Sequence, residues 1–165
     1  MSQIEAAEAV LPCNGSRAWA SALAEHRPLS SFPELLAASD AAWWGMGQGD
    51  WEEAFRSHPR IGDRHAQGLT TAVSLQWSEA EQVTMAAERH LHSRLAEGNL
   101  AYEEKFGRVF LVRAAGRSSA EILTILESRM HNTLEAELHE AAEQQRQITQ
   151  LRLQRWLAKG EVHAA

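Results

Sequence analysis

The sequence predicts an all-α single-domain fold, a helical bundle of about seven to eight helices with one extended crossing segment. Alanine, leucine, glutamate, glutamine and arginine are abundant among the 165 residues and only 4 are proline, a composition that favours helix. One short run, 108–113, has the β-branched and aromatic residues of a strand, but no second run could pair with it. We therefore expect it to cross a helical core. The length suits one domain over residues 1–165.

Four short helices are predicted before residue 60, and small polar side chains mark where they begin. The expected ranges are 4–11, 17–26, about 32–46 and 51–57. Asn14 or Ser16 is suited to cap the second helix, Ser30 or Ser31 the third, and Asp50 the fourth, because their side chains can accept hydrogen bonds from free backbone amides.

The second half is predicted to hold longer helices that end at glycines. The polar stretch 62–74 is expected to be a loop, long enough for a functional role. Helices are then expected at 79–97, 100–106, 119–131 and 133–159. Gly98, Gly107 and Gly160 follow three of them, where glycine readily adopts the conformation that ends a helix.

His58 follows the predicted fourth helix and is a candidate for acid–base chemistry. Pro59 cannot continue a helix and disfavours helical geometry at His58, and Gly62 permits a turn. The imidazole is therefore expected at a helix end, and imidazole accepts and donates protons near neutral pH. From these residues alone, a simple helix stop with an exposed ring is the favoured interpretation.

Arg152 lies at the centre of the predicted apolar face of the last helix. At about 100° per residue, five apolar side chains fall within about 40° of one line: Leu134, Leu138, Ala141, Ile148 and Trp156. Gln145 is the only other polar residue close to that line. A guanidinium there is unfavourable unless it is paired. Its partner is either a structural carboxylate, such as Glu81 or Glu135, or an anionic ligand.

Two further patterns have structural interpretations. Ser78 and Glu81 have the spacing of a capping box at a helix start, and on that pattern alone capping is favoured. The apolar run 110–112 would by default belong to the core. An extended segment without a partner strand, however, leaves backbone groups that need partners, and a ligand could supply them.

Four stretches together resemble the OHCU decarboxylases, which act on 2-oxo-4-hydroxy-4-carboxy-5-ureidoimidazoline (OHCU) in urate degradation. In order they are His58-Pro59-Arg60-Ile61-Gly62-Asp63, Ser78-Glu79-Ala80-Glu81-Gln82, the stretch 99–107 leading into Phe110-Leu111-Val112, and Leu151-Arg152-Leu153. The likeness extends from about residue 19 to residue 156. Each motif is weak alone, but four in order at plausible spacing are a strong match.

The resemblance implies loss of the C4 carboxylate of OHCU as CO₂, giving (S)-allantoin without a cofactor or metal. It implies that His58 is the general acid or base. Glu81 would orient or deprotonate the hydroxyl and raise the pKa of His58, and Arg152 would anchor an anionic or carbonyl group. The substrate-binding residues it implies are Pro59, Ser78, Gln82, Phe110, Leu111, Val112 and Ala114. It also implies a homodimer.

Composition excludes several other classes. A net charge of −6 argues against nucleic-acid binding, and no run of 18 apolar residues predicts a membrane span. A single cysteine, Cys13, and an N-terminus unlike a signal peptide favour the cytoplasm. No metal-binding motif is present. Two alternatives stay open: a non-catalytic helical interaction module, and a lyase or hydrolase acting on a related ureido acid.

Overall fold

The computed structural model describes the backbone of residues 1–61 and 79–164 and the side chains of residues 1–61 and 86–160. Within these ranges the chain forms seven helices and no strand, so the predicted all-α class is confirmed. None of these helices is long and apolar enough to cross a membrane. The chain divides into two compact units, one of residues Met1–His58 and His139 onward, the other Pro59–Leu138. The assignment of residues 1–165 to one domain stays a prediction.

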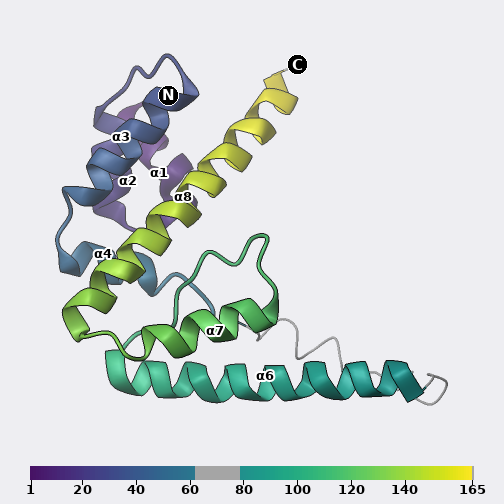
Figure 1. Cartoon of the computed structure of the whole chain (residues 1–165). Coiled ribbons are helices and arrows are strands. Elements are labelled where there is room, and N and C mark those ends of the chain that lie inside the picture. Colours follow the sequence, from purple (N-terminus) through teal and green to yellow (C-terminus); the bar gives the residue numbers. More distant parts are fainter. Residues whose placement is uncertain (62–78, 165) are drawn as a thin grey trace. The chain divides into compact units, whose positions relative to one another are not determined.

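The first unit contains α1 (Gln3–Asn14), α2 (Arg17–Glu25), α3 (Phe32–Trp44), α4 (Gln48–Phe55) and most of α8 (Leu134–Ala164) (Figure 1). Ser2, Ser16 and Ser31 begin the first three helices, since each hydroxyl accepts a hydrogen bond from the backbone amide three residues later. Ser16 and Ser31 are therefore the caps, out of the two candidates that the sequence offered for each helix.

Among α1 to α4, two helix boundaries differ from the prediction by three residues. α1 continues through Pro12 to Asn14, and Gly15 ends it with a φ of 99°, a left-handed conformation that favours glycine. Asp50 does not cap α4, which begins after Gly47 without a side-chain cap. Asp50 lies in the first turn instead, where a negative charge interacts favourably with the helix dipole.

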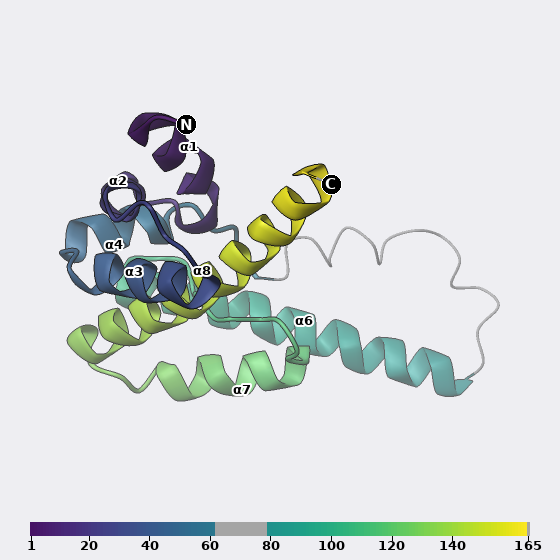
Figure 2. The same cartoon turned by 90° about the horizontal axis from the view of Figure 1, so that it is seen from above.

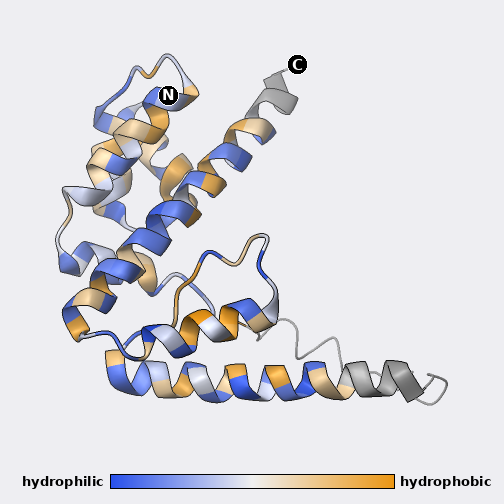
Figure 3. Cartoon of the chain, in the orientation of Figure 1, coloured by the Kyte–Doolittle hydropathy of each residue, from blue (hydrophilic) through white to orange (hydrophobic). Residues whose placement is uncertain are grey.

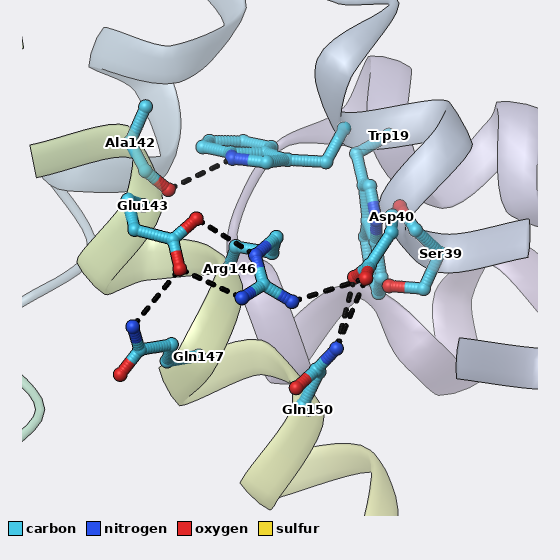
Figure 4. A network of polar contacts seen from close by, with 9 residues as sticks. Trp19, Ser39, Asp40, Ala142, Glu143, Arg146, Gln147 and Gln150 are labelled. Carbon is cyan, nitrogen blue, oxygen red and sulfur yellow. Dashed lines mark hydrogen bonds and ion pairs between the residues drawn. The ribbon is translucent and has the colours of Figure 1, made fainter. Parts of the chain in front are cut away.

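A cluster of charged and amide side chains joins α3 to the middle of α8 (Figure 4). Arg146 donates to Asp40 on α3 at 3.0 Å and to both carboxylate oxygens of Glu143 at 2.7 and 2.8 Å. Gln150, one turn further along α8, also donates to Asp40 at 3.0 Å. Because Asp40 is shared between two successive turns, the cluster fixes both the rotation and the register of α8 against α3.

Buried indoles reinforce this packing inside the first unit. Trp43 is almost fully buried and its Nε1 donates to the backbone oxygen of Ala142 on α8 at 2.9 Å. Trp51 of α4 donates to the backbone oxygen of Trp43 at 3.0 Å, and the two rings lie 5.9 Å apart. Buried aromatic N–H groups need such acceptors. The indoles thus connect α3, α4 and α8, and the contact on α8 lies three residues before Gln145.

In the second unit, α6 (Glu79–Phe106) and α7 (Ser119–Arg129) run side by side in the same direction (Figures 1 and 2). This parallel arrangement requires the non-helical segment 107–118 to return along the pair. Phe110 and Val112 of that segment join residues of both helices in the core cluster of this unit. The cluster consists of Leu95, Tyr102, Phe106, Phe110, Val112, Ile122, Leu123 and Leu126. The predicted crossing segment is therefore non-helical and buried, as expected.

One long helix replaces the two helices predicted at 79–97 and 100–106. Gly98 lies inside α6, where a Cβ atom would be 2.5 Å from Cδ2 of the buried Leu126 on α7. The missing side chain lets two helices approach closely and does not end one. Gly107, with a φ of 71°, does end α6 as predicted, whereas Gly160 lies within α8. Hydrophilic and hydrophobic bands alternate along the coloured part of α6 in Figure 3, and its buried residues Leu95, Tyr102 and Phe106 belong to the core cluster.

Candidate active site

His58 lies just beyond the end of α4, where its half-buried ring is turned toward α8. Its backbone amide donates to the oxygen of Phe55 at 3.2 Å, which closes the last turn of α4. On the ring, Nε2 lies 2.7 Å from Oε1 of Gln145, which is fully buried on α8. The simple helix stop with an exposed ring, favoured from local residues alone, does not describe this environment.

Gln145 begins a chain of buried polar contacts that ends at the junction of α1 and α2. Its Nε2 donates to Oγ1 of Thr149 at 3.1 Å. The same hydroxyl accepts from Nδ2 of Asn14 at 3.0 Å, and Oδ1 of Asn14 accepts from the backbone amide of Ser16 at 3.1 Å. We call His58, Gln145, Thr149 and Asn14 the imidazole relay. Satisfied buried networks of this kind hold their members rigidly.

The surroundings of His58 favour a neutral ring. Burial lowers its pKa from the ordinary value of 6.5 to about 4, and the positive charge of Arg152 acts in the same direction. The hydrogen bond with Gln145 acts in the opposite direction with a smaller effect. Near neutral pH the imidazole is therefore uncharged and able to accept a proton.

Arg152 is half-buried on α8 and supplies positive potential beside His58. Within residues 1–61 and 86–160 no carboxylate pairs with it. Glu135, one partner considered from the sequence, is exposed, and the side chain of Glu81, the other, lies outside the described residues. Burial lowers the pKa of Arg152, which reflects the cost of a buried cation that an anionic ligand would offset.

The buried face of α8 is not centred on the line of residues that the sequence predicted. Leu134, at one end of the predicted line, is 63% exposed. The buried face instead follows Ala141, Gln145, Thr149 and Leu153, all within 2% of complete burial. Two polar side chains occupy it because they satisfy each other and the rest of the imidazole relay. A search for apolar periodicity cannot detect a buried face whose polar residues are paired.

The motif that follows His58 is anchored within the second unit on α6. Arg60 Nε and Nη2 donate to the two carboxylate oxygens of Glu103 at 2.6 and 2.7 Å. Asn99, one turn earlier, donates to the backbone oxygen of Ile61 at 3.0 Å. Asn99 and Glu103 both belong to the third motif of the sequence. Their spacing of four residues places both on one face of α6, which explains why these two motifs occur together.

The predicted substrate-binding residues differ in burial, and some of them lie outside the described residues. Phe110, Leu111 and Val112 are buried, whereas Pro59 and Ala114 are exposed. Ser78 lies outside the described residues, as do the side chains of Glu81 and Gln82 and the predicted loop 62–74. The capping box of residues 78–81 is likewise outside.

The carbonyl of Leu111, a backbone group that the extended segment could offer to a ligand, already has a protein partner. Its oxygen accepts a hydrogen bond from Nη1 of Arg129 at 2.6 Å. The Arg129 guanidinium also lies 4.7 Å from the centre of the Phe110 ring. One backbone group of the segment 110–112 is therefore satisfied by Arg129 of α7 and does not need a ligand.

Among residues 1–61 and 86–160, neither a metal site nor an activated thiol accompanies His58. Cys13 is buried and burial raises the pKa of its thiol, which disfavours the reactive thiolate. In the part of the chain that the structure describes, no three His, Cys, Asp or Glu side chains could hold a metal ion together. An open cavity of about 530 Å³ in the first unit is lined mainly by apolar residues, such as Val10, Leu23 and Trp156, and does not include His58.

The family model of the OHCU decarboxylases matches residues 1–154 of this chain. The chain belongs to the OHCU decarboxylase family. The resemblance seen in the four motifs is thus confirmed.

Known relatives of this family member agree in fold and sequence. The chain is 35% identical over 143 residues, 86% of its length, to the uric acid degradation bifunctional protein TTL of Arabidopsis thaliana, but spans only 44% of that protein. It is 31% identical to an OHCU decarboxylase crystallised in the presence of (S)-allantoin, with a TM-score of 0.71 over 90% of this chain and 96% of that one. A crystal structure of (S)-allantoin synthase is 20% identical and shows the same fold, with a TM-score of 0.66 over 96% of this chain and 51% of that one.

The environment of His58 leads to a prediction about pH. We expect the His58 imidazole of the substrate-free protein to titrate well below 6.5, at about 4. The unfolded chain binds this proton at higher pH than the folded chain does. The free energy of unfolding should therefore decrease as the pH falls from about 6.5 toward 4. Titration of ¹⁵N-histidine signals, assigned by their loss in His58→Asn, measures the value.

The same titration separates two influences on His58. Burial and Arg152 lower its pKa, whereas the motif resemblance implies that the charge of Glu81 raises it. A midpoint at or above 6.5 would contradict the prediction and show that a carboxylate dominates. Repeating the titration in Glu81→Gln would then identify that carboxylate.

Proposed function

We propose that this chain converts OHCU to (S)-allantoin by releasing the C4 carboxylate as CO₂. The observation that carries the proposal is a half-buried imidazole, held by a buried amide, beside an arginine for which no described carboxylate is a partner. A proton acceptor and an anion-binding cation are what decarboxylation of a hydroxy acid requires. Membership of the family supplies the substrate class.

The chemistry assigns a task to each catalytic group. When CO₂ leaves, two electrons stay on the ring, and the adjacent C=N accepts them and takes one proton from solvent on its nitrogen. The hydroxyl proton must then depart, and one proton must reach a ring carbon from a single face. Neutral His58 accepts first. Once protonated, an imidazole with so low a pKa is a strong donor and can deliver the proton to carbon.

Arg152 and Glu81 complete the proposed catalytic set. Arg152 binds the carboxylate or a carbonyl oxygen, and its two parallel N–H groups suit such a planar acceptor. Glu81 orients or deprotonates the hydroxyl. The proposed substrate contacts, which rest on the motif resemblance, are Pro59, Ser78, Gln82, Phe110, Leu111, Val112 and Ala114.

Further proposals concern the working form of the enzyme. We propose a homodimer that acts in the cytoplasm without a metal or cofactor. The single cysteine and the acidic composition are compatible with this setting, and size-exclusion chromatography with light scattering measures the oligomeric state.

The test of the proposed function uses freshly generated OHCU, which decays unaided to racemic allantoin. We expect the protein to accelerate formation of one enantiomer, visible as circular dichroism of the product over time. Slow racemic product at the uncatalysed rate would contradict the proposal. Parallel assays on related ureido acids would then show whether the site serves a different substrate.

A further inference from the structure

The fixed orientation of one amide in the imidazole relay determines which nitrogen of His58 carries the proton. The relay can be read from its far end, because the backbone amide of Ser16 can only donate. Oδ1 of Asn14 accepts from it at 3.1 Å, so the NH₂ group of Asn14 faces Thr149 at 3.0 Å. Asn14 is completely buried, so no water competes for this amide.

Thr149 transmits this orientation to Gln145. Its Oγ1 accepts from Asn14 and, at 3.1 Å, from Nε2 of Gln145. A hydroxyl oxygen has two lone pairs, so Oγ1 can accept from both amides at once. With its NH₂ group toward Thr149, Gln145 presents the carbonyl oxygen Oε1 to His58 at 2.7 Å. A carbonyl oxygen can only accept, so in this orientation of the amide Nε2 of His58 is the donor. The opposite orientation, in which the Thr149 hydroxyl donates to Gln145, would place an NH₂ group against an unprotonated Nε2.

The backbone around Gln145 is held as firmly as its side chain. Ala142, one turn before, accepts from the buried indole of Trp43 at 2.9 Å. Arg146, the next residue, is fixed between Asp40 and Glu143 (Figure 4). Gln145 itself is completely buried. The position of the amide is therefore fixed, and its hydrogen bond to Thr149 favours the orientation with Oε1 toward His58.

We propose that Gln145 is a positioning residue that keeps the proton of neutral His58 on Nε2 and makes Nδ1 the nitrogen that exchanges a proton with substrate. The catalytic consequence rests on the proposed function. In the reaction, the Nδ1 lone pair takes the proton, Nε2–H stays bonded to Gln145 throughout, and Nδ1–H then returns the proton to carbon. Second partners of functional histidines commonly set the tautomer in this way.

The decisive measurement is the ¹⁵N spectrum of the histidine ring at neutral pH, which needs no substrate. In the wild-type protein we expect His58 to show a protonated Nε2 and an unprotonated Nδ1. In Gln145→Met, which lacks the acceptor, we expect a mixture of tautomers, with kcat/KM for OHCU decreasing about 10- to 100-fold and KM little changed. A wild-type spectrum with the proton on Nδ1 would overturn the proposal.

Matched variants separate tautomer control from packing. Gln144 is the neighbouring buried glutamine, 8% exposed, and its amide donates to Glu140 at 2.9 Å. Gln144→Met removes an amide of the same size from the same helix and should leave both the His58 spectrum and kcat/KM unchanged. Equal losses of activity in both variants, with no change of tautomer in Gln145→Met, would show that Gln145 is merely structural.

Two further variants keep the proposal testable if Gln145→Met does not fold. Thr149→Val removes the hydroxyl that orients the amide, so the His58 signals should again show both tautomers. Gln145→Glu keeps an acceptor and adds a charge, so Nε2 should stay protonated while the pKa of His58 rises. Unchanged spectra in both variants would overturn the proposal. A wild-type protein that does not act on OHCU would contradict the proposed function. The spectra would still decide which nitrogen of His58 carries the proton beside Gln145.

Discussion

Replacement of His58 by asparagine should lower the stereoselective formation of (S)-allantoin by about 10²- to 10⁴-fold, the range that general acid–base groups contribute. Asparagine preserves polarity but cannot exchange a proton near neutral pH. The backbone of residue 58 closes the last turn of α4 whatever the side chain is, so the fold should persist. The circular dichroism of the product gives the rate, and the thermal midpoint reports on folding.

Two companion variants sharpen this test. His58→Gln offers Gln145 an amide donor in place of Nε2–H and so retains the contact without the proton chemistry; its activity should be as low as that of His58→Asn. His26→Asn changes an exposed histidine at the end of α2 and should retain full activity. If His58→Gln kept near wild-type rates, the imidazole would be a structural element and not the acid or base.

Local signals in the sequence predicted most helix boundaries correctly. Ser16 and Ser31 begin helices because capping depends only on neighbouring amides. Gly98 misled the prediction, because its role depends on Leu126, which lies 28 positions away and against it in space. A glycine that ends a helix and a glycine that admits a neighbouring helix look alike in sequence.

The candidate site shows the same division between local and distant information. His58 and Arg152 were singled out from motifs, and the chemistry proposed for them follows from their residue types. The relay partners were missed because Asn14 and Thr149 are 135 positions apart and meet only in the folded unit. The one available signal was Gln145, a polar residue on an otherwise apolar line. The low pKa of His58 also depends on burial, which no local pattern contains.

Replacement of Glu137 by alanine should lower the free energy of unfolding by about 3–5 kcal/mol, the usual cost of leaving one member of a buried ion pair without its partner. Glu137 is completely buried at the start of α8, and Oε1 accepts from the hydroxyl of Tyr102 and from Nε of Arg129 at 2.9 Å. Oε2 accepts from Asn132 at 2.9 Å. Without this carboxylate, Arg129, only 5% exposed, keeps its charge and the single acceptor at Leu111.

Denaturant unfolding followed by circular dichroism measures this loss, and two controls assign it to the buried charge. Glu127→Ala breaks the pair with Arg94, whose side chains are 54% and 47% exposed, and should cost less than about 1 kcal/mol. The double variant Arg129→Met with Glu137→Leu removes both charges and should be more stable than Glu137→Ala, because no unpaired ion stays buried. If Glu137→Ala lost no more stability than Glu127→Ala, the pair would contribute little. Packing would then account for the position of Arg129 against the segment 110–112, without a contribution from the ion pair with Glu137.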